Sequence, residues 1–124
     1  MDYPKVLLVE DDLELSDVIK DHLSSMKCAV EIAPDGHQAI KMMENKKYTC
    51  LISDIRMPVM DGIEMIRKMR SLGIETPVIF MTGFSSYTAE EIADVGGVVL
   101  LEKPFTSEQL SEIVTGYIEL LEAG

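Results

Sequence analysis

Acidic, hydroxyl and amine side chains come directly after four short apolar runs of the chain. These side chains are, in chain order, Asp11, Asp12, Asp54, Thr82 and Lys103. If the runs are strands of one parallel sheet, their carboxyl ends share an edge and these groups become neighbours. Two carboxylates about 4 Å apart repel by about 4 kcal/mol at an effective dielectric constant near 20. Such a cluster therefore needs a proton, a lysine or a metal ion.

A few carboxylate oxygens that leave other coordination positions free suit Mg²⁺, or Mn²⁺ in its place. These ions keep several water ligands and also bind phosphate oxygens. Phosphoryl transfer needs little more from a protein than positioning and neutralisation of charge. A carboxylate that accepts a phosphoryl group is also established covalent chemistry. The residues therefore predict a phosphoryl-accepting aspartate beside a divalent metal ion.

Five apolar runs alternate with five amphipathic stretches. The runs 6–9, 29–33, 50–52, 78–81 and 98–101 are short and rich in β-branched residues, as is typical of strands buried on both faces. Apolar residues three and four apart predict helices near 15–26, 36–44, 63–69, 87–94 and 110–121. Thr106 and Gln109 form a capping-box pattern before the last helix. This alternation predicts an α/β fold with a doubly wound five-stranded parallel sheet.

The composition excludes several classes of protein. With 124 residues the chain has the size of one domain, and no apolar run approaches the roughly 20 residues of a membrane span. The 11 basic and 22 acidic residues leave a net charge of −11, which argues against direct binding of nucleic acid. Cys28 and Cys50 lack metal-ligand spacing, so we expect buried, reduced thiols in a soluble cytoplasmic protein.

Four blocks of the sequence resemble the receiver domain of two-component response regulators. They are Leu7-Leu8-Val9-Glu10-Asp11-Asp12, Ser53-Asp54-Ile55-Arg56-Met57-Pro58-Val59-Met60-Asp61-Gly62, Thr82-Gly83 and Lys103-Pro104-Phe105. The resemblance runs from about Lys5 to Leu121, with every block in order. It implies a flavodoxin-like (βα)5 fold with strand order 2-1-3-4-5.

The resemblance also implies a role for each site residue. Asp54 is the phosphoacceptor, and Asp11 and Asp12 bind Mg²⁺ together with Asp54 and the backbone carbonyl of Arg56. Thr82 donates a hydrogen bond to the phosphoryl group, and Lys103 pairs with it. The peptide bond between Lys103 and Pro104 is expected to be cis. Glu10 is given no role, because it could simply face solvent.

By the same resemblance, the phosphoryl donor is a sensor histidine kinase or a histidine phosphotransfer protein. A downstream protein would bind the face formed by the fourth helix, fifth strand and fifth helix, and the domain would be a monomer or a phosphorylation-dependent dimer. We expect residues 1–124 to be a single receiver domain without an output domain, because the chain ends soon after its last predicted helix. Such a protein is not an enzyme beyond its own phosphorylation and dephosphorylation.

One position departs from the family pattern. Receivers commonly carry Tyr or Phe three residues before the lysine, and this chain has Leu100 there. The usual coupling between threonine and aromatic ring therefore cannot operate in its familiar form. We expect a remodelled output face in which Phe84 or Tyr87 responds instead, and in which Phe84 shields the phosphoryl group from water.

Two other functions remain open on the sequence. Leu100 is compatible with a receiver-like scaffold that works without phosphorylation. Haloacid-dehalogenase-like phosphatases also use a strand-end Asp with Mg²⁺, Thr and Lys. They need a second Asp two residues after the nucleophile, where this chain has Arg56.

Overall fold

The computed structural model describes residues 3–82 and 88–123. Strands and helices alternate strictly along these residues. The five strands are β1 (Lys5–Val9), β2 (Ala29–Ala33), β3 (Cys50–Asp54), β4 (Val78–Thr82) and β5 (Gly97–Glu102). The five helices are α1 (Leu13–Ser25), α2 (Gly36–Asn45), α3 (Gly62–Ser71), α4 (Ala89–Asp94) and α5 (Ser107–Ala123).

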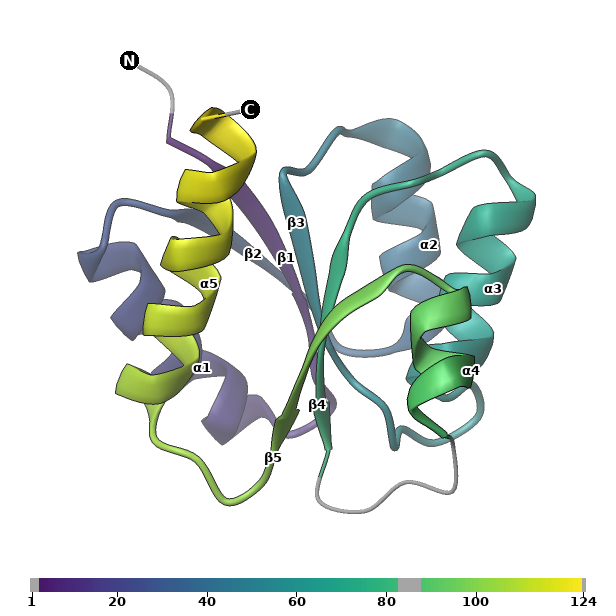
Figure 1. The fold of residues 1–124 in the computed structure, drawn as a ribbon. Helices are drawn as coiled ribbons and strands as arrows, with labels where there is room; N and C mark the ends of the chain where they lie inside the picture. Colours follow the sequence, from purple (N-terminus) through teal and green to yellow (C-terminus); the bar gives the residue numbers. More distant parts are fainter. Residues whose placement is uncertain (1–2, 83–87, 124) are drawn as a thin grey trace.

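The strands form one parallel sheet in the order β2-β1-β3-β4-β5. Helices α1 and α5 cover one face, and α2, α3 and α4 cover the other (Figure 1). The predicted doubly wound fold and its strand order are confirmed. Because all strands point the same way, their carboxyl ends lie at one edge of the sheet, the lower edge in Figure 1.

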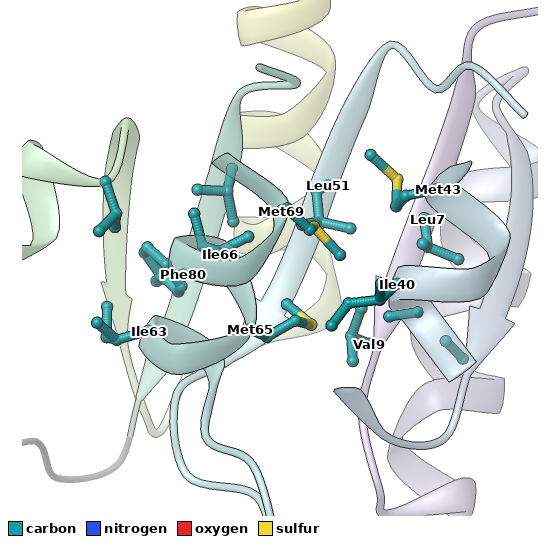
Figure 2. Close-up of a cluster of buried hydrophobic side chains, with 14 of the residues drawn as sticks. Leu7, Val9, Ile40, Met43, Leu51, Ile63, Met65, Ile66, Met69 and Phe80 are labelled. Atoms are coloured by element: carbon teal, nitrogen blue, oxygen red, sulfur yellow. The ribbon is translucent and has the colours of Figure 1, made fainter. Parts of the chain in front are cut away.

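Each face of the sheet has its own apolar core. On the side of α2, α3 and α4, Figure 2 shows Phe80 beside Ile66 and Leu51 beside Met69 of α3, and Leu7 beside Met43 of α2. The second core, under α1 and α5, contains Val6, Leu8, Cys50, Ile52, Ile79 and Met81 from the strands. Even-numbered residues of β1 and β3 thus face α1 and α5, and odd-numbered residues face α2 and α3.

Helix ends follow the predicted signals. The Thr106 hydroxyl accepts from the amide of Gln109 at 3.0 Å, and the Gln109 side chain accepts from the amide of Thr106 at 2.9 Å, so the capping box is confirmed. Gly73 ends α3 with a φ of 82°, as expected of a C-terminal glycine. Both cysteines are free and buried. In the described ranges no helix has the length and apolar character needed to cross a membrane.

Candidate functional site

The carboxyl ends of β1, β3, β4 and β5 bring the predicted residues to one rim. Asp54 is the last residue of β3, and Thr82 is the last residue of β4. Asp11 follows β1, and Lys103 follows β5. Both Asp54 and Thr82 are 5% exposed, so their polar groups lie at the bottom of this rim.

Lys103 forms hydrogen bonds with the last residues of β3 and β4. Its ammonium nitrogen donates to Oδ2 of Asp54 at 2.9 Å, and its backbone amide donates to the carbonyl of Thr82 at 2.7 Å. The peptide bond to Pro104 is cis, as expected. Burial lowers the pKa of Lys103, but the hydrogen bond and charge of Asp54, aided by Glu10 and Asp11, outweigh it and raise the pKa above its usual value. Lys103 is therefore protonated and positively charged beside Asp54.

Three carboxylates gather next to this lysine. Glu10, Asp11 and Asp54 each offer an oxygen, and these oxygens lie within 4.8 Å of one another. Glu10 is only 2% exposed, and its Oε2 has no hydrogen-bond partner among the described residues. A buried carboxylate oxygen without a partner is costly unless a cation binds it. The oxygen donors and the unsatisfied atom fit Mg²⁺, which prefers such ligands.

The crowding of carboxylates also affects Glu10. Burial, followed by the charge of Asp54, raises the pKa of Glu10 from 4.5 to about 7. The charge of Lys103 and the amide of Asp12 act in the opposite direction without cancelling this rise. A bound divalent cation would supply the positive charge that this cluster lacks.

Asp12 lies at the start of α1. Its carboxylate accepts from the amide of Leu15 at 3.2 Å and so caps the N-terminus of α1. Asp12 is exposed and lies outside the group of three acids, whereas Glu10, to which the sequence assigned no role, lies inside it. Glu10 also accepts from the amide of Asp12 at 3.3 Å. Glu10 is therefore a further candidate ligand beside Asp11, and the expected metal-binding role of Asp12 stays a prediction.

Two further groups surround the Asp54 carboxylate. The backbone amide of Arg56 donates to Oδ1 of Asp54 at 3.2 Å. The hydroxyl of Thr82 is buried and lacks a hydrogen-bond partner within residues 3–82 and 88–123. The expected roles of the Arg56 carbonyl as a metal ligand and of the Thr82 hydroxyl as a phosphoryl ligand stay predictions.

The expectations for Phe84 and Tyr87 fall on residues 83–87, which lie outside the described residues. Leu100 pairs with Phe80 across β4 and β5, which places its backbone in the sheet. Its side chain also lies outside the described part of the structure. The expected remodelling of the output face therefore stays a prediction.

The chain has relatives that carry the same fold. It is 33% identical over 108 residues to the response regulator MprA of Mycobacterium sp. (strain KMS), which covers 86% of this chain and 46% of that protein. It thus spans about half the length of the curated relatives that it matches. The receiver domain of the Francisella response regulator 1452 superposes with a TM-score of 0.86 at 28% identity, covering 95% of this chain and 98% of that one.

A second solved structure is similar to the same extent. The Vibrio cholerae chemotaxis protein CheY4 gives a TM-score of 0.83 at 30% identity, covering 91% of this chain and 97% of that one. A family model described as the response regulator receiver domain matches residues 6–115. Together with the acids, the threonine and the lysine at the rim, this match identifies the chain as a member of the response regulator receiver domain family of two-component signalling.

Proposed function

We propose that Asp54 accepts a phosphoryl group while Mg²⁺ is bound by Glu10, Asp11 and Asp54. One observation carries this proposal: the oxygens of these three acids lie within 4.8 Å of one another, and Lys103 contacts Asp54 at 2.9 Å. Mn²⁺ would suit the same oxygens. Receiver domains typically bind Mg²⁺, and they are signalling proteins rather than enzymes in the usual sense.

The transfer follows from the residues around Asp54. An oxygen of its carboxylate attacks the phosphorus atom, and a new O–P bond forms as the bond to the donor breaks. The donor keeps the electron pair of the broken bond, and a proton from solvent neutralises it. When bound, Mg²⁺ neutralises negative charge on the phosphoryl oxygens and the carboxylates.

The chain's own residues would then hold the product. Lys103 exchanges its contact with Asp54 for one with a phosphoryl oxygen, and the Thr82 hydroxyl donates to another. The amide and carbonyl of Arg56 complete the surroundings of the phosphoryl group and the metal ion. The buried Thr82 hydroxyl supports this arrangement, because it has no partner among the described residues and would gain one when the phosphoryl group arrives.

The partners follow from the family. A response regulator implies a histidine kinase as its partner, and we propose a sensor histidine kinase or a histidine phosphotransfer protein in the cytoplasm as the donor. A downstream protein would bind the face formed by α4, β5 and α5; in Figure 1 the edge strand β5 lies between α5 on its left and α4 on its right. We propose that phosphorylation changes this contact, with the domain as a monomer or a phosphorylation-dependent dimer. On this proposal, residues 1–124 act as one receiver unit.

Intact-mass analysis tests the proposal. We expect acetyl phosphate and Mg²⁺ to add one phosphoryl group to the chain, and Asp54→Asn or excess EDTA to abolish it. The matched control is Asp61→Asn, because Asp61 lies in the same β3–α3 connection but its carboxylate caps α3. An adduct that persists in Asp54→Asn would overturn the proposal, as would its absence from the wild-type chain. Steady hydrolysis of phosphate esters would instead point to a phosphatase.

A further inference from the structure

Ser53 places a hydroxyl in the apolar core under α2 and α3. It is fully buried in β3, and its neighbours across the sheet are Val9 and Phe80, both members of that core. Because side chains alternate along a strand, Ser53 and Asp54 point to opposite faces. The hydroxyl therefore lies on the side of the sheet away from the rim acids, where an apolar residue would be expected.

The Ser53 hydroxyl donates to the backbone carbonyl of Asp54 at 2.8 Å. That carbonyl belongs to the peptide unit between Asp54 and Ile55, whose amide donates to the carbonyl of Met81 at 3.0 Å. Gly62, at the start of α3, packs closely against the same peptide unit. A Cβ built at Gly62 would lie 2.5 Å from the Asp54 carbonyl oxygen and 3.2 Å from the Ser53 hydroxyl oxygen. This peptide unit is thus held by β4, by the start of α3 and by Ser53.

The held peptide unit leads directly into the site. The next residue after Ile55 is Arg56, whose amide donates to Oδ1 of Asp54 at 3.2 Å. A rotation of the Asp54–Ile55 peptide would move the Arg56 backbone relative to the carboxylate of Asp54. The orientation of the Asp54–Ile55 peptide therefore determines the position of the Arg56 backbone relative to the Asp54 carboxylate.

We infer that Ser53 is a positioning residue that sets the Arg56 backbone against the Asp54 carboxylate and thereby tunes the affinity for Mg²⁺. The inference rests on the proposed function of Asp54. Without the hydroxyl, a buried carbonyl loses its partner. The Asp54–Ile55 peptide then rotates so that its carbonyl reaches another donor. This rotation moves the Arg56 backbone relative to the Asp54 carboxylate, although Ser53 itself lies on the other face of the sheet.

Two measurements on Ser53→Ala separate positioning from simple stability. In the metal-free protein, we expect the amide resonance of Arg56 to shift as its bond to Asp54 weakens. In calorimetric titration with Mg²⁺, we expect affinity to fall roughly tenfold, the lower end of the effect of removing a group that orients metal ligands. Ser53→Thr keeps the hydroxyl and should restore both values toward those of the wild-type chain.

The matched control is Ser111→Ala. Ser111 is also buried, at 1% exposure, and its hydroxyl also donates to a backbone carbonyl, that of Glu108 at 3.0 Å, but it lies within α5. Both alanine variants should unfold at lower urea concentration, and only Ser53→Ala should change Mg²⁺ binding. If Ser53→Ala does not fold, Ser53→Cys keeps the shape with a weaker donor and should give the same changes in smaller measure.

The outcomes distinguish this inference from the proposal beneath it. If the wild-type chain forms the Mg²⁺-dependent adduct and Ser53→Ala or Ser53→Cys binds Mg²⁺ as the wild-type chain does, with an unmoved Arg56 amide, the inference alone is overturned. If the wild-type chain neither binds Mg²⁺ nor forms the adduct, the proposed function fails and the inference fails with it.

Discussion

The ammonium group of Lys103 lies 2.9 Å from Oδ2 of Asp54, and the two residues come from the ends of β5 and β3. Without a metal ion, this lysine is the positive partner of three crowded carboxylates. It is 30% exposed as a side chain, whereas the side chain of Asp54 is 7% exposed, so the contact is largely sheltered from water. Lys103 is thus a cation that the described residues place directly against Asp54.

Replacing Lys103 with Met should lower the free energy of unfolding in EDTA by about 1–3 kcal/mol, because a sheltered carboxylate loses its charged hydrogen-bond donor. Saturating Mg²⁺ should recover most of this loss. Urea unfolding with EDTA or Mg²⁺ measures both. Lys46→Met is the control, since its pair with Glu31 at 3.0 Å is exposed and should contribute less than about 1 kcal/mol in either condition. Equal losses in the two variants would contradict the prediction.

Glu10 should make the metal-free protein less stable as the pH rises. Its folded-state pKa of about 7 exceeds the ordinary value of 4.5, so the folded state holds the proton more tightly than the unfolded state. The contribution of Glu10 is therefore complete below pH 4.5 and is lost as the pH rises through about 7. Each pKa unit corresponds to about 1.4 kcal/mol, which limits the loss to about 3 kcal/mol.

Unfolding of Glu10→Gln in EDTA checks this pH dependence. The variant should match the wild-type chain near pH 4.5 and exceed its stability increasingly up to about pH 7. Glu14→Gln, at an exposed position in the first turn of α1, should show no such divergence. A constant difference between Glu10→Gln and the wild-type chain at every pH would show that Glu10 titrates normally.

The ends of α1 and α3 offer a paired test of backbone strain. Lys27 follows α1 with a φ of 66°, and its amide and that of Cys28 donate to the carbonyls of Ser24 and Leu23. Gly73 ends α3 with the same pattern and a φ of 82°. Lys27→Gly should therefore stabilise the protein by roughly 1 kcal/mol, and Gly73→Ala should destabilise it by a similar amount. Thermal unfolding measures both, and the same sign in both variants would refute the explanation.

Two glycines predict opposite results for the same substitution. Gly62→Ala places a Cβ 2.5 Å from the backbone carbonyl of Asp54, so it should lower stability by about 2 kcal/mol or more and slow adduct formation. Gly116 lies on the exposed face of α5, and a methyl group added there would meet nothing within 4 Å. Gly116→Ala should therefore raise stability by up to about 1 kcal/mol. Unfolding midpoints and the intact-mass rate decide the comparison.

The fold was predictable because its signals are local. Strands buried on both faces read as short apolar runs, and capping residues such as Thr106 mark where a helix begins. Because both faces of these strands are buried, the sequence does not show which face of the sheet each side chain points to. Val6 and Leu8 look no different from Leu7 and Val9 in sequence, although the structure assigns them to different cores.

This ambiguity explains why no role was predicted for Glu10 from the sequence. Val6 pairs with Cys50 and Leu8 with Ile52, all on the face of α1 and α5, so continuing the alternation puts Glu10 on the side of Asp54. The three successive acids from Glu10 to Asp12 do not show in sequence which of them lies on the side of Asp54. Only the register between β1 and β3 makes that choice.

The start of β1 and the end of α5 lie at the edge of the sheet opposite the rim acids (Figure 1). A biotin tag or a short tether attached at either end would therefore leave the whole rim turned toward the solution. Such an immobilised chain presents Asp54 to a passing phosphodonor in one orientation, which makes the domain suited to surface-based kinetics of phosphoryl uptake.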